Sequence, residues 1–371
     1  MTEISRRTLF RLSGLSTLAA GAVTFEPILV SPASAVTNRQ RFNLTASGHP
    51  LLTDSSGEYG IDTGVSTIPQ SFGFDEAASV DSLFVVQRTE LGAQTDNGNL
   101  VITRFLKDGR TRFVPNGGQM KVLGAGHGGG LGVEHYPGVS DPYLWIECNV
   151  NAGGRGEGIC RIKYRDTTTV PDTRPNLDRN PAVPNVAPVL SGWMEPRAYI
   201  DHRFQQLALC YKNADGNRRR IVVYCMADIR TSNAAVINNL SSLTPKLDRV
   251  VIRHEAPFNE PYEPNVSKEP VQGFCVYGDF AYLWQGGAGE KTRITSYDLA
   301  APPPPAGAGN EYVDFVERAD VTIWKDMARR EAEGIAVRHD FGSDGVGDQL
   351  VYGLVKSDDT LWLAYKQGFT T

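Results

Sequence analysis

Sequence motifs for metal or cofactor binding are missing from this chain of 371 residues. It contains no zinc spacing, calcium loop, Walker loop or dinucleotide fingerprint, so we expect no cofactor and no bound metal. Cysteine is scarce as well: the five residues are odd in number and widely spaced, which is untypical of a disulfide framework. A pair between Cys210 and Cys225 on neighbouring strands is one alternative, and free buried thiols are the other.

Long hydrophobic runs are missing too, which bears on the first 35 residues. Ser5–Phe10 contains paired arginines, Leu12–Val23 is mildly apolar, and Ala33–Ala35 reads as a cleavage site. The apolar run is shorter than the ~20 residues that a transmembrane helix needs. We therefore predict a cleaved twin-arginine signal peptide over residues 1–35 and a secreted protein, with the cell wall as one location open to it. Residues 36–371 are expected to form a single domain.

A strong charge of either sign is also lacking, since the formal net charge is −5. This mild acidity disfavours partners that bind through a basic overall field. We expect no nucleic-acid partner, no insertion into a membrane, and a monomer.

Glycine and proline are plentiful, with 38 and 22 residues, which favours all-β architecture. Five times the chain shows a short strand with an apolar-x-apolar pattern that starts with a small or polar residue. These strands are Gln70–Asp75, Gly129–Glu134, Pro196–Asp201, Gln272–Tyr277 and Glu333–Arg338. Second apolar strands follow at Leu83–Val86, Tyr143–Ile146, Leu207–Cys210, Ala281–Trp284 and Gln349–Tyr352. Self-similarity of this kind indicates a radial β-repeat.

Further alternating runs follow most of the second strands after hairpin turns such as Asp215–Gly216. With a closing strand, each unit holds about four antiparallel strands, and we predict an all-β, five-bladed β-propeller. Arg41–Leu44 is expected to pair beside Leu361–Tyr365 and so to join the two ends of the chain. The proline-rich stretches are expected to be surface loops; they are Thr169–Ser191, Pro257–Pro270 and Ala301–Asn310.

The strand starts form a candidate site, because a propeller gathers equivalent positions of its repeats around one axis. Among the residues at or beside these starts, His127 and Glu333 are candidate catalytic acid/base groups. Arg197 is a candidate clamp for a carboxylate or phosphate.

Four further residues at the starts are candidates for ligand binding. Gln70 and Gln272 occupy the same aligned position as Glu333 and could donate hydrogen bonds to sugar hydroxyls. Glu195 lies next to the start at Pro196. Trp193 lies in a turn just before that strand and could stack on a sugar ring.

A purely structural interpretation of these polar groups is also open: they could line a water-filled channel and satisfy one another. Gly126–Gly130 reads Gly-His-Gly-Gly-Gly, like the oxyanion loop of some esterases, but the sequence has no Gly-x-Ser-x-Gly elbow. Its glycines are better explained by close approach of the backbone to a ligand or to crowded inner strands. Trp145 and Trp284 lie within second strands, which favours packing between blades.

Several short motifs carry a family resemblance through their order and spacing. They are Gln70–Asp75, Gly126–Gly128, Gly132–Glu134, Tyr143–Asn149, Val271–Phe274, Tyr277–Asp279 and Glu333–Val337. The chain resembles the β-propeller family of teichoic acid biosynthesis protein C, which is similar to the propeller platform of staphylococcal phage receptor-binding proteins. The resemblance covers about Arg41 to Phe369. It implies a five-bladed propeller that contacts cell-wall glycopolymers, and it implies no catalytic residues. Because the chain is acidic, a polyanion would need a local basic pocket, for which Arg155, Arg161 and Arg197 are candidates.

Three functions stay open on this basis. The first is a secreted propeller that binds a cell-wall or extracellular glycopolymer, teichoic-acid-like or another polysaccharide, at its axial face. The second is a hydrolase or lyase that cleaves this polymer, with His127 and Glu333 exchanging protons while Arg197 neutralises a uronate or phosphodiester. The third is a non-catalytic propeller that binds other proteins.

Overall fold

A computed structural model describes most of the chain after residue 39, within one compact unit, Thr37–Thr371. The described residues are 40–44, 48–51, 61, 63, 67–77, 80–89, 98–108, 112–136, 138–165, 185–188, 191–214, 218–252, 270–287, 292–301, 313–318, 331–339, 347–355 and 360–370. The signal peptide expected over residues 1–35 lies outside them and stays a prediction.

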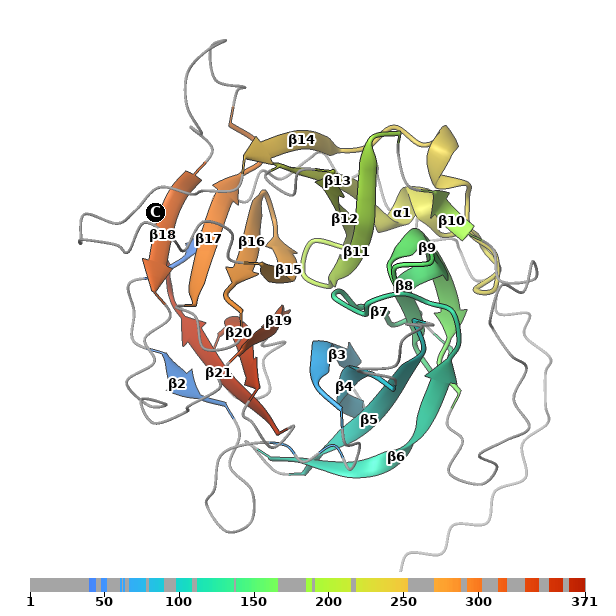
Figure 1. The fold of residues 1–371 in the computed structure, drawn as a ribbon, viewed down its shortest axis with the longest axis horizontal. Coiled ribbons are helices and arrows are strands. Elements are labelled where there is room, and N and C mark those ends of the chain that lie inside the picture. Colours follow the sequence, from blue (N-terminus) through green and yellow to red (C-terminus); the bar gives the residue numbers. More distant parts are fainter. Residues whose placement is uncertain are drawn as a thin grey trace, which may run out of the picture. The chain divides into compact units, whose positions relative to one another are not determined.

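Most of the described part of this unit belongs to five antiparallel sheets of four strands each, arranged around a common centre (Figure 1). Sheet 1 consists of β3 (Pro69–Ala77), β4 (Val80–Arg88), β5 (Leu100–Asp108) and β6 (Arg112–Val122). Sheet 2 consists of β7 (Gly132–Glu134), β8 (Tyr143–Val150), β9 (Gly156–Lys163) and β10 (Asn185–Pro188). Sheet 3 consists of β11 (Trp193–Asp201), β12 (Gln206–Asn213), β13 (Arg218–Cys225) and β14 (Leu247–Ile252). Sheet 4 consists of β15 (Val271–Tyr277), β16 (Phe280–Gln285), β17 (Arg293–Asp298) and β18 (Val313–Arg318). Sheet 5 consists of β19 (Glu331–Arg338), β20 (Gln349–Val355), β21 (Leu361–Gln367) and β2 (His49–Pro50).

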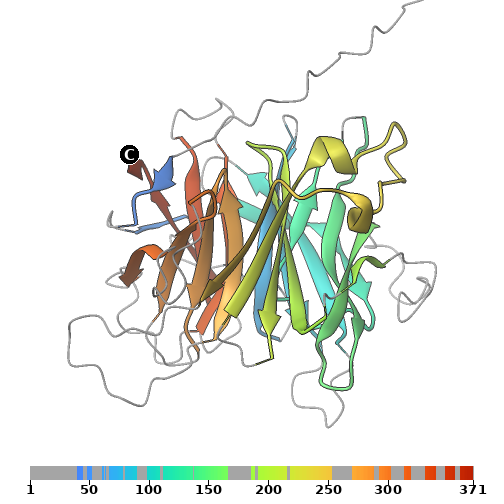
Figure 2. The ribbon, with the colours of Figure 1, turned by 90° about the horizontal axis from the view of Figure 1, so that it is seen from above.

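The all-β prediction is confirmed. Four of the five predicted first strands and all five predicted second strands fall within the first and second strands of the five sheets, whereas only the last three residues of the predicted strand Gly129–Glu134 form a strand, β7. The innermost strands are β3, β7, β11, β15 and β19. Each of them contacts the innermost strands of the two neighbouring sheets, β19 against β3 included. A view from the side shows the sheets standing face to face (Figure 2). The starts of all five inner strands therefore lie at one end of the central axis and their ends lie at the other.

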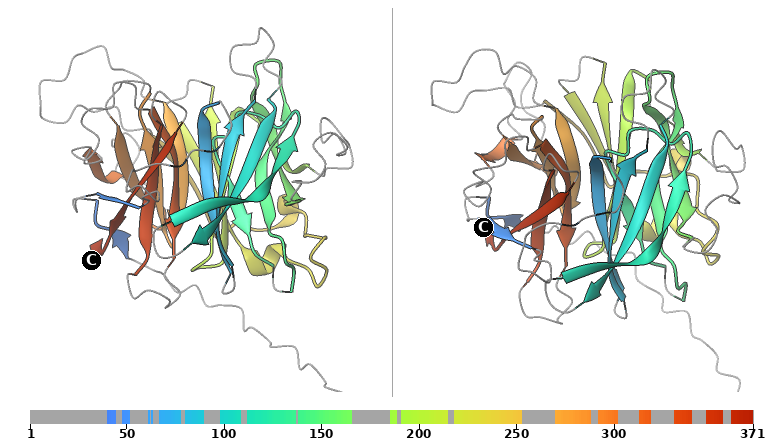
Figure 3. Two further views of the ribbon diagram at one scale, coloured as in Figure 1. Left: turned by 90° about the horizontal axis from the view of Figure 1, so that it is seen from below. Right: turned by 60° about the horizontal axis from the view of Figure 1, so that its bottom comes forward.

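The N-terminal strands join the last sheet, although not as predicted. Residues His49–Pro50, rather than Arg41–Leu44, pair with β21, while β1 (Arg41–Phe42) pairs with β22 (Phe369–Thr370) (Figure 3). Phe42 explains the difference, because it anchors β1 on sheet 4. Its amide donates to the hydroxyl of Tyr282 (3.0 Å), and its ring centroid lies 4.9 Å from that of Tyr277.

One predicted loop contains a strand. Asn185–Pro188, within the proline-rich stretch Thr169–Ser191, pairs with β9 as the outer strand of sheet 2. An edge strand tolerates proline because half of its backbone groups need no partner in the ladder. Apart from their end residues Pro270 and Ala301, the stretches Pro257–Pro270 and Ala301–Asn310 lie outside the described residues.

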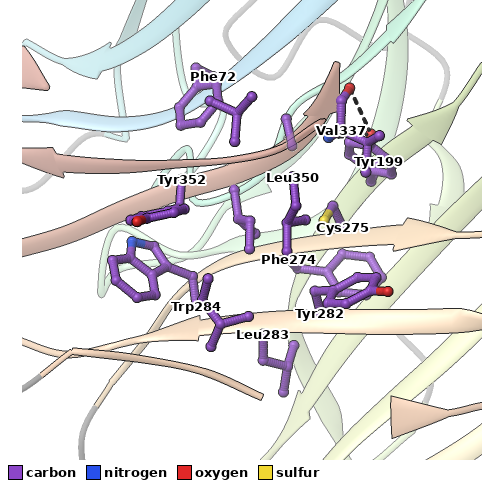
Figure 4. Close-up of a cluster of buried hydrophobic side chains, with 14 of the residues drawn as sticks. Phe72, Tyr199, Phe274, Cys275, Tyr282, Leu283, Trp284, Val337, Leu350 and Tyr352 are labelled. Carbon is purple, nitrogen blue, oxygen red and sulfur yellow. Dashed lines mark hydrogen bonds between the residues drawn. The ribbon is translucent and has the colours of Figure 1, made fainter. Parts of the chain in front are cut away.

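The inner and second strands are buried between neighbouring sheets, and Figure 4 shows part of this core. Trp145 and Trp284 are fully buried and donate to Glu134 Oε2 (2.8 Å) and to the Gly353 carbonyl (2.7 Å). Packing explains both indoles, as expected. The inner strands approach so closely that a Cβ on Gly130 would lie 2.7 Å from the Cβ of Arg197 on β11, which supports crowding as the reason for glycine at this position of the segment Gly126–Gly130.

Helix is rare in the described residues and is confined to α1 (Met226–Ile229) and the 3₁₀ turn Leu240–Ser242. None of the helices there is long and apolar enough to span a bilayer. The five cysteines are free. Cys225 lies opposite Gln206, four residues along β12 from Cys210, so the suggested pair between Cys210 and Cys225 is wrong.

Candidate functional site

Four of the five inner strands are irregular at their starts. The pairing register shifts between Pro69 and Ser71, Met194 and Arg197, Val271 and Gly273, and Ala332 and Ile335. The residues inside these shifts include the predicted site residues Gln70, Glu195, Gln272 and Glu333. A bulge leaves residues unpaired and re-aims their side chains, so these positions share one structural cause. In β19 the bulge needs glycine, because Gly334 has φ +71°.

The fifth inner strand, β7, is preceded by the glycine-rich segment that contains His127. The carboxylate of Glu147 on β8 holds this segment in place. Its Oε2 accepts hydrogen bonds from the amides of His127 (3.0 Å) and Gly156 (3.1 Å). A side chain on Gly126, whose φ is +152°, would collide with the same carboxylate. Glu147 is thus the reason why the chain turns here and presents His127 at the start of the strand.

Arg197 is the central cation of the site. Only 6% of its surface is exposed, and its guanidinium lies over the backbone of Gly129, where an added Cβ would be 2.9 Å from Cζ. Nη2 donates to the Val271 carbonyl of the neighbouring sheet (2.7 Å). Among the described residues, the buried Nη1 has no hydrogen-bond partner. A buried donor without a partner is costly, which makes Nη1 a place where a ligand oxygen would be stabilised.

His127 interacts with a cation that had no predicted role, Arg88 at the end of β4. Arg88 Nη1 lies 3.2 Å from His127 Nδ1. Because a guanidinium can only donate, Nδ1 accepts, and the neutral ring carries its proton on Nε2. Burial and the charges of Arg155, Arg88, Arg197 and Lys212 hold the pKa of His127 well below its usual value. The ring is therefore neutral at pH 7 and offers a donor rather than a basic lone pair.

The pKa values of two carboxyl groups at the strand starts shift in opposite directions. Burial of Glu195 would raise its pKa, but its hydrogen bond from Lys212 (2.6 Å) and the nearby Arg155 (3.5 Å) lower it. Burial of Glu333 and the charge of Glu331 raise its pKa well above the usual value, against the opposing effect of Arg197 and Arg88. The surroundings thus favour the ionised form of Glu195 and the protonated form of Glu333.

The structure brings Arg197 within electrostatic reach of His127, Glu195 and Glu333, so these four predicted residues form one cluster. The two glutamines face other partners. Gln272 donates to Glu331 Oε1 (2.8 Å), and the amide of Gln70 lies near the carbonyls of Ile68 and Pro69 (3.3 and 3.4 Å). Their roles as donors to a ligand stay predictions.

The surroundings of Trp193 and Arg161 differ from those expected for a stacking platform and for a member of the basic pocket. Trp193 is half-buried and packs against the core of sheet 3, so at most its exposed part is available for stacking. Arg161 does not belong to the basic pocket. It pairs with Glu134 (2.7 Å) at the far end of β7 and stacks on the Tyr143 ring (3.6 Å).

Sequence reasoning missed Arg88, Lys212, Glu147 and Glu331. Arg88 and Lys212 lie at the ends of second strands, opposite the starts of β3 and β11. Because hairpins reverse direction, the end of each second strand lies at the same end of the axis as the start of the first. Both cations could therefore have been identified from the sequence, at the ends of the predicted second strands.

Two hydrogen bonds cross the axis near the ends of the inner strands. The hydroxyl of Tyr199 on β11 accepts from the Val337 amide (2.8 Å) and donates to its carbonyl (3.4 Å), across to the non-neighbouring strand β19 (Figure 4). In the described ranges, no three His, Cys, Asp or Glu side chains are arranged to hold a metal ion.

Comparison with known proteins adds information on the fold. No family model and no curated protein matches the chain. Among solved structures, the tail fibre of Staphylococcus aureus phage P68 superposes with a TM-score of 0.54 at 14% identity, over 87% of this chain and 53% of the fibre. The chain thus spans about half of the tail fibre's length, and at this identity the likeness concerns the fold alone.

Weaker superpositions are found with glycoside hydrolases. A GH43_1 enzyme from Xanthomonas citri gives a TM-score of 0.42 at 12% identity, covering 88% of this chain and 94% of the enzyme. The exo-β-1,3-galactanase from Phanerochaete chrysosporium gives 0.41 at 10% identity, covering 89% and 64%.

Proposed function

We propose that this chain is an exported five-bladed β-propeller that binds an anionic, teichoic-acid-like glycopolymer where its inner strands start. The propeller is supported by five four-stranded sheets, by contacts between successive inner strands and by the likeness to a phage tail fibre. Export rests on the twin-arginine pattern near Ser5–Phe10.

The observation that carries the proposal is the unpartnered Nη1 of the buried Arg197. Its neighbours also present donors: neutral His127 offers Nε2–H, and protonated Glu333 offers O–H. A pocket of donors fits a group that only accepts, such as a phosphodiester or carboxylate, better than a sugar hydroxyl that must also donate.

The acidity of the whole chain does not oppose this binding, because the nearby charges differ from the average. Arg88, Arg155, Arg197 and Lys212 all act on His127. Within about 10 Å, local charges outweigh distant ones at moderate salt. Glu195 offsets part of this field but is itself bound to Lys212.

Cleavage of the polymer is a second candidate function. Of the two predicted acid/base residues, His127 and Glu333, the geometry favours only Glu333. His127 is a poor general base, because Arg88 occupies its Nδ1 lone pair. The raised pKa of Glu333 favours the protonated form that a general acid needs. An enzyme would thus use Glu333 as its acid.

The test is binding of residues 36–371 to poly(glycerol phosphate), polygalacturonate and uncharged dextran by isothermal titration. We expect binding to an anionic polymer and none to dextran. Arg197→Gln should weaken it about 10- to 100-fold, as expected for hydrogen bonds to a charged group worth ~1.5–3 kcal/mol. Arg203→Gln, an exposed arginine beyond the opposite end of β11, is the matched control and should bind like the wild type. Equal loss in both variants, or equal affinity for dextran, would contradict the proposal. Release of fragments that stops in Glu333→Gln would identify an enzyme.

A further inference from the structure

The opposite ends of the inner strands carry a second cluster, which polymer binding does not use. Three of the chain's six histidines directly follow inner strands: His135 follows β7, His202 follows β11 and His339 follows β19. Two of these strands end in a carboxylate, Glu134 on β7 and Asp201 on β11. The contact between Tyr199 and Val337 lies between this cluster and the starts of the inner strands.

His339 contacts residues from several sheets. Its Nδ1 lies 3.3 Å from Asp348 Oδ2, and its Nε2 lies 3.7 Å from Asp201 Oδ1 on β11. Its backbone amide donates to Glu76 on β3. The imidazole is fully buried and stacks on Tyr277 of β15 at 6.0 Å between centroids. One side chain and its amide thus connect sheet 5 to sheets 1, 3 and 4.

The groups around His339 are mainly acidic. Glu76, Asp201 and Asp348 face it directly, and Tyr277 donates to Asp348 Oδ2 (2.8 Å). Two groups oppose a positive charge there. Arg203 lies 4.0 Å from Asp348, and the ring of His202 is 6.2 Å from that of His339.

The ionisation of the two neighbouring histidines differs. Burial would lower the pKa of His339, but Glu76, Asp348 and Asp201 together raise it above its usual value. Burial and the positive charge of His339 lower the pKa of His202 to about 3. His339 therefore keeps its proton to a higher pH than an ordinary histidine, whereas His202 stays neutral down to about pH 3.

We propose that protonated His339 is a proton-sensitive clamp that ties the end of β19 to β3, β11 and β15, and that loss of its proton loosens this joint. The joint matters because β19 and β3 belong to the last and first sheets, which meet there. At the same end, His135 Nδ1 lies 3.5 Å from Asp75 Oδ1, so that side chains of sheets 2 and 1 meet there as well.

The sign of the pH effect follows from linkage. A histidine with a raised folded pKa stabilises fully below its unfolded value of about 6.5. This contribution is lost as the pH rises through the folded pKa. His202 acts in the opposite sense, since its contribution is lost as the pH falls from about 6.5 towards about 3. Stability should therefore decline on the alkaline side because of His339 and on the acidic side because of His202.

The test is amide hydrogen exchange of residues 36–371 at pH 6 and pH 9, expressed as protection factors corrected for the intrinsic rate. Amides of β19 and β3 should lose protection at pH 9, roughly tenfold for each unit by which the pKa of His339 is raised. Amides of β12 and β13, far from the joint, should change less. Unchanged protection at β19 and β3 would overturn the proposal.

A substitution distinguishes the contribution of His339 from other causes of lower stability at alkaline pH. Thermal unfolding of His339→Gln should show a smaller decline in Tm between pH 6 and pH 9 than the wild type. His49→Gln, on the exposed outer strand β2, should keep the wild-type decline. A wild-type decline in His339→Gln would contradict the clamp. If that variant does not fold, titration of the His339 ring by NMR in the wild type decides, since a ring pKa at or below about 6.5 would also contradict it.

Discussion

Directly after the bulge in β11, the guanidinium nitrogen Nη1 of buried Arg197 has no partner among the described residues, whereas at the end of the strand buried Asp201 accepts hydrogen bonds from three backbone amides. Those bonds come from Arg203 (3.0 Å), Phe204 (3.1 Å) and Gly278 (2.9 Å). The same strand thus carries an unsatisfied cation next to its bulge and a satisfied anion at its end. Unsatisfied buried groups are candidates for ligand binding, and satisfied groups stabilise the fold.

The backbone explains part of this difference. At their starts, four inner strands are bulged, which breaks the ladder and turns side chains away from the sheet. At their ends the pairing is regular, and the side chains bridge to neighbouring sheets. The start is therefore expected to control binding and the end to control stability.

The largest expected effect is on stability, from Asp201→Asn at the far end. In one orientation, the side-chain NH₂ group of the asparagine would face a backbone N–H that now donates to Asp201. In either orientation, His339 would lose the negative charge of the carboxylate. Breaking such a buried pair costs about 3–5 kcal/mol. Urea unfolding measures the loss, and polymer affinity should be retained. Glu195→Gln at the start should cost only about 1 kcal/mol, because its partners are partly exposed. Equal losses of stability in Asp201→Asn and Glu195→Gln would contradict the difference between the two ends of the inner strands.

A second prediction concerns Glu333→Gln, whose side chain mimics the protonated acid. A carboxyl group with a raised pKa destabilises the fold as the pH rises above about 4.5, because the unfolded chain ionises first. The variant should be more stable than the wild type at pH 8, by about 1.4 kcal/mol for each unit of the shift. Urea unfolding from pH 5 to pH 8 measures this difference. If the difference in free energy of unfolding between the variant and the wild type stays constant from pH 5 to pH 8, Glu333 is ionised throughout this range.

A third prediction separates a donor from a base at His127. Because its pKa is well below the usual value, polymer affinity should be flat between pH 6 and pH 8. His127→Phe should weaken binding about tenfold, since one hydrogen bond to a charged group is lost. Calorimetry at several pH values checks both. A tenfold change in affinity centred near pH 6.5 would show that the ring titrates.

The smallest effect is expected from Arg155→Gln at the rim. Arg155 is 40% exposed, so its contribution is screened by salt. Affinity should fall by less than about tenfold, mainly through the association rate, and the difference should fade at high salt. Kinetic measurements at two salt concentrations test this. Lys163→Gln, an exposed lysine near Asp141, is the control and should leave binding unchanged.

The sequence was sufficient to predict the all-β class, the positions of the inner strands and the cluster of His127, Arg197, Glu195 and Glu333. Period-two alternation and repeated strand starts are local signals, and equivalent positions meet by symmetry. Arg88 could have been found from its position at the end of a second strand, but the role of Glu147 depends on a carboxylate that reaches two backbone amides, which no local pattern encodes. The strand at Asn185–Pro188 was missed because proline content masks an edge strand.

NMR titration tests the central claim most directly. The protein would be labelled at the side-chain nitrogens of arginine and histidine and titrated with poly(glycerol phosphate). We predict that signals of Arg197 and His127 shift with the polymer while those of His339 do not. Shifts at His339 alone, or no shift at Arg197 at saturating polymer, would contradict a binding site at the starts of the inner strands.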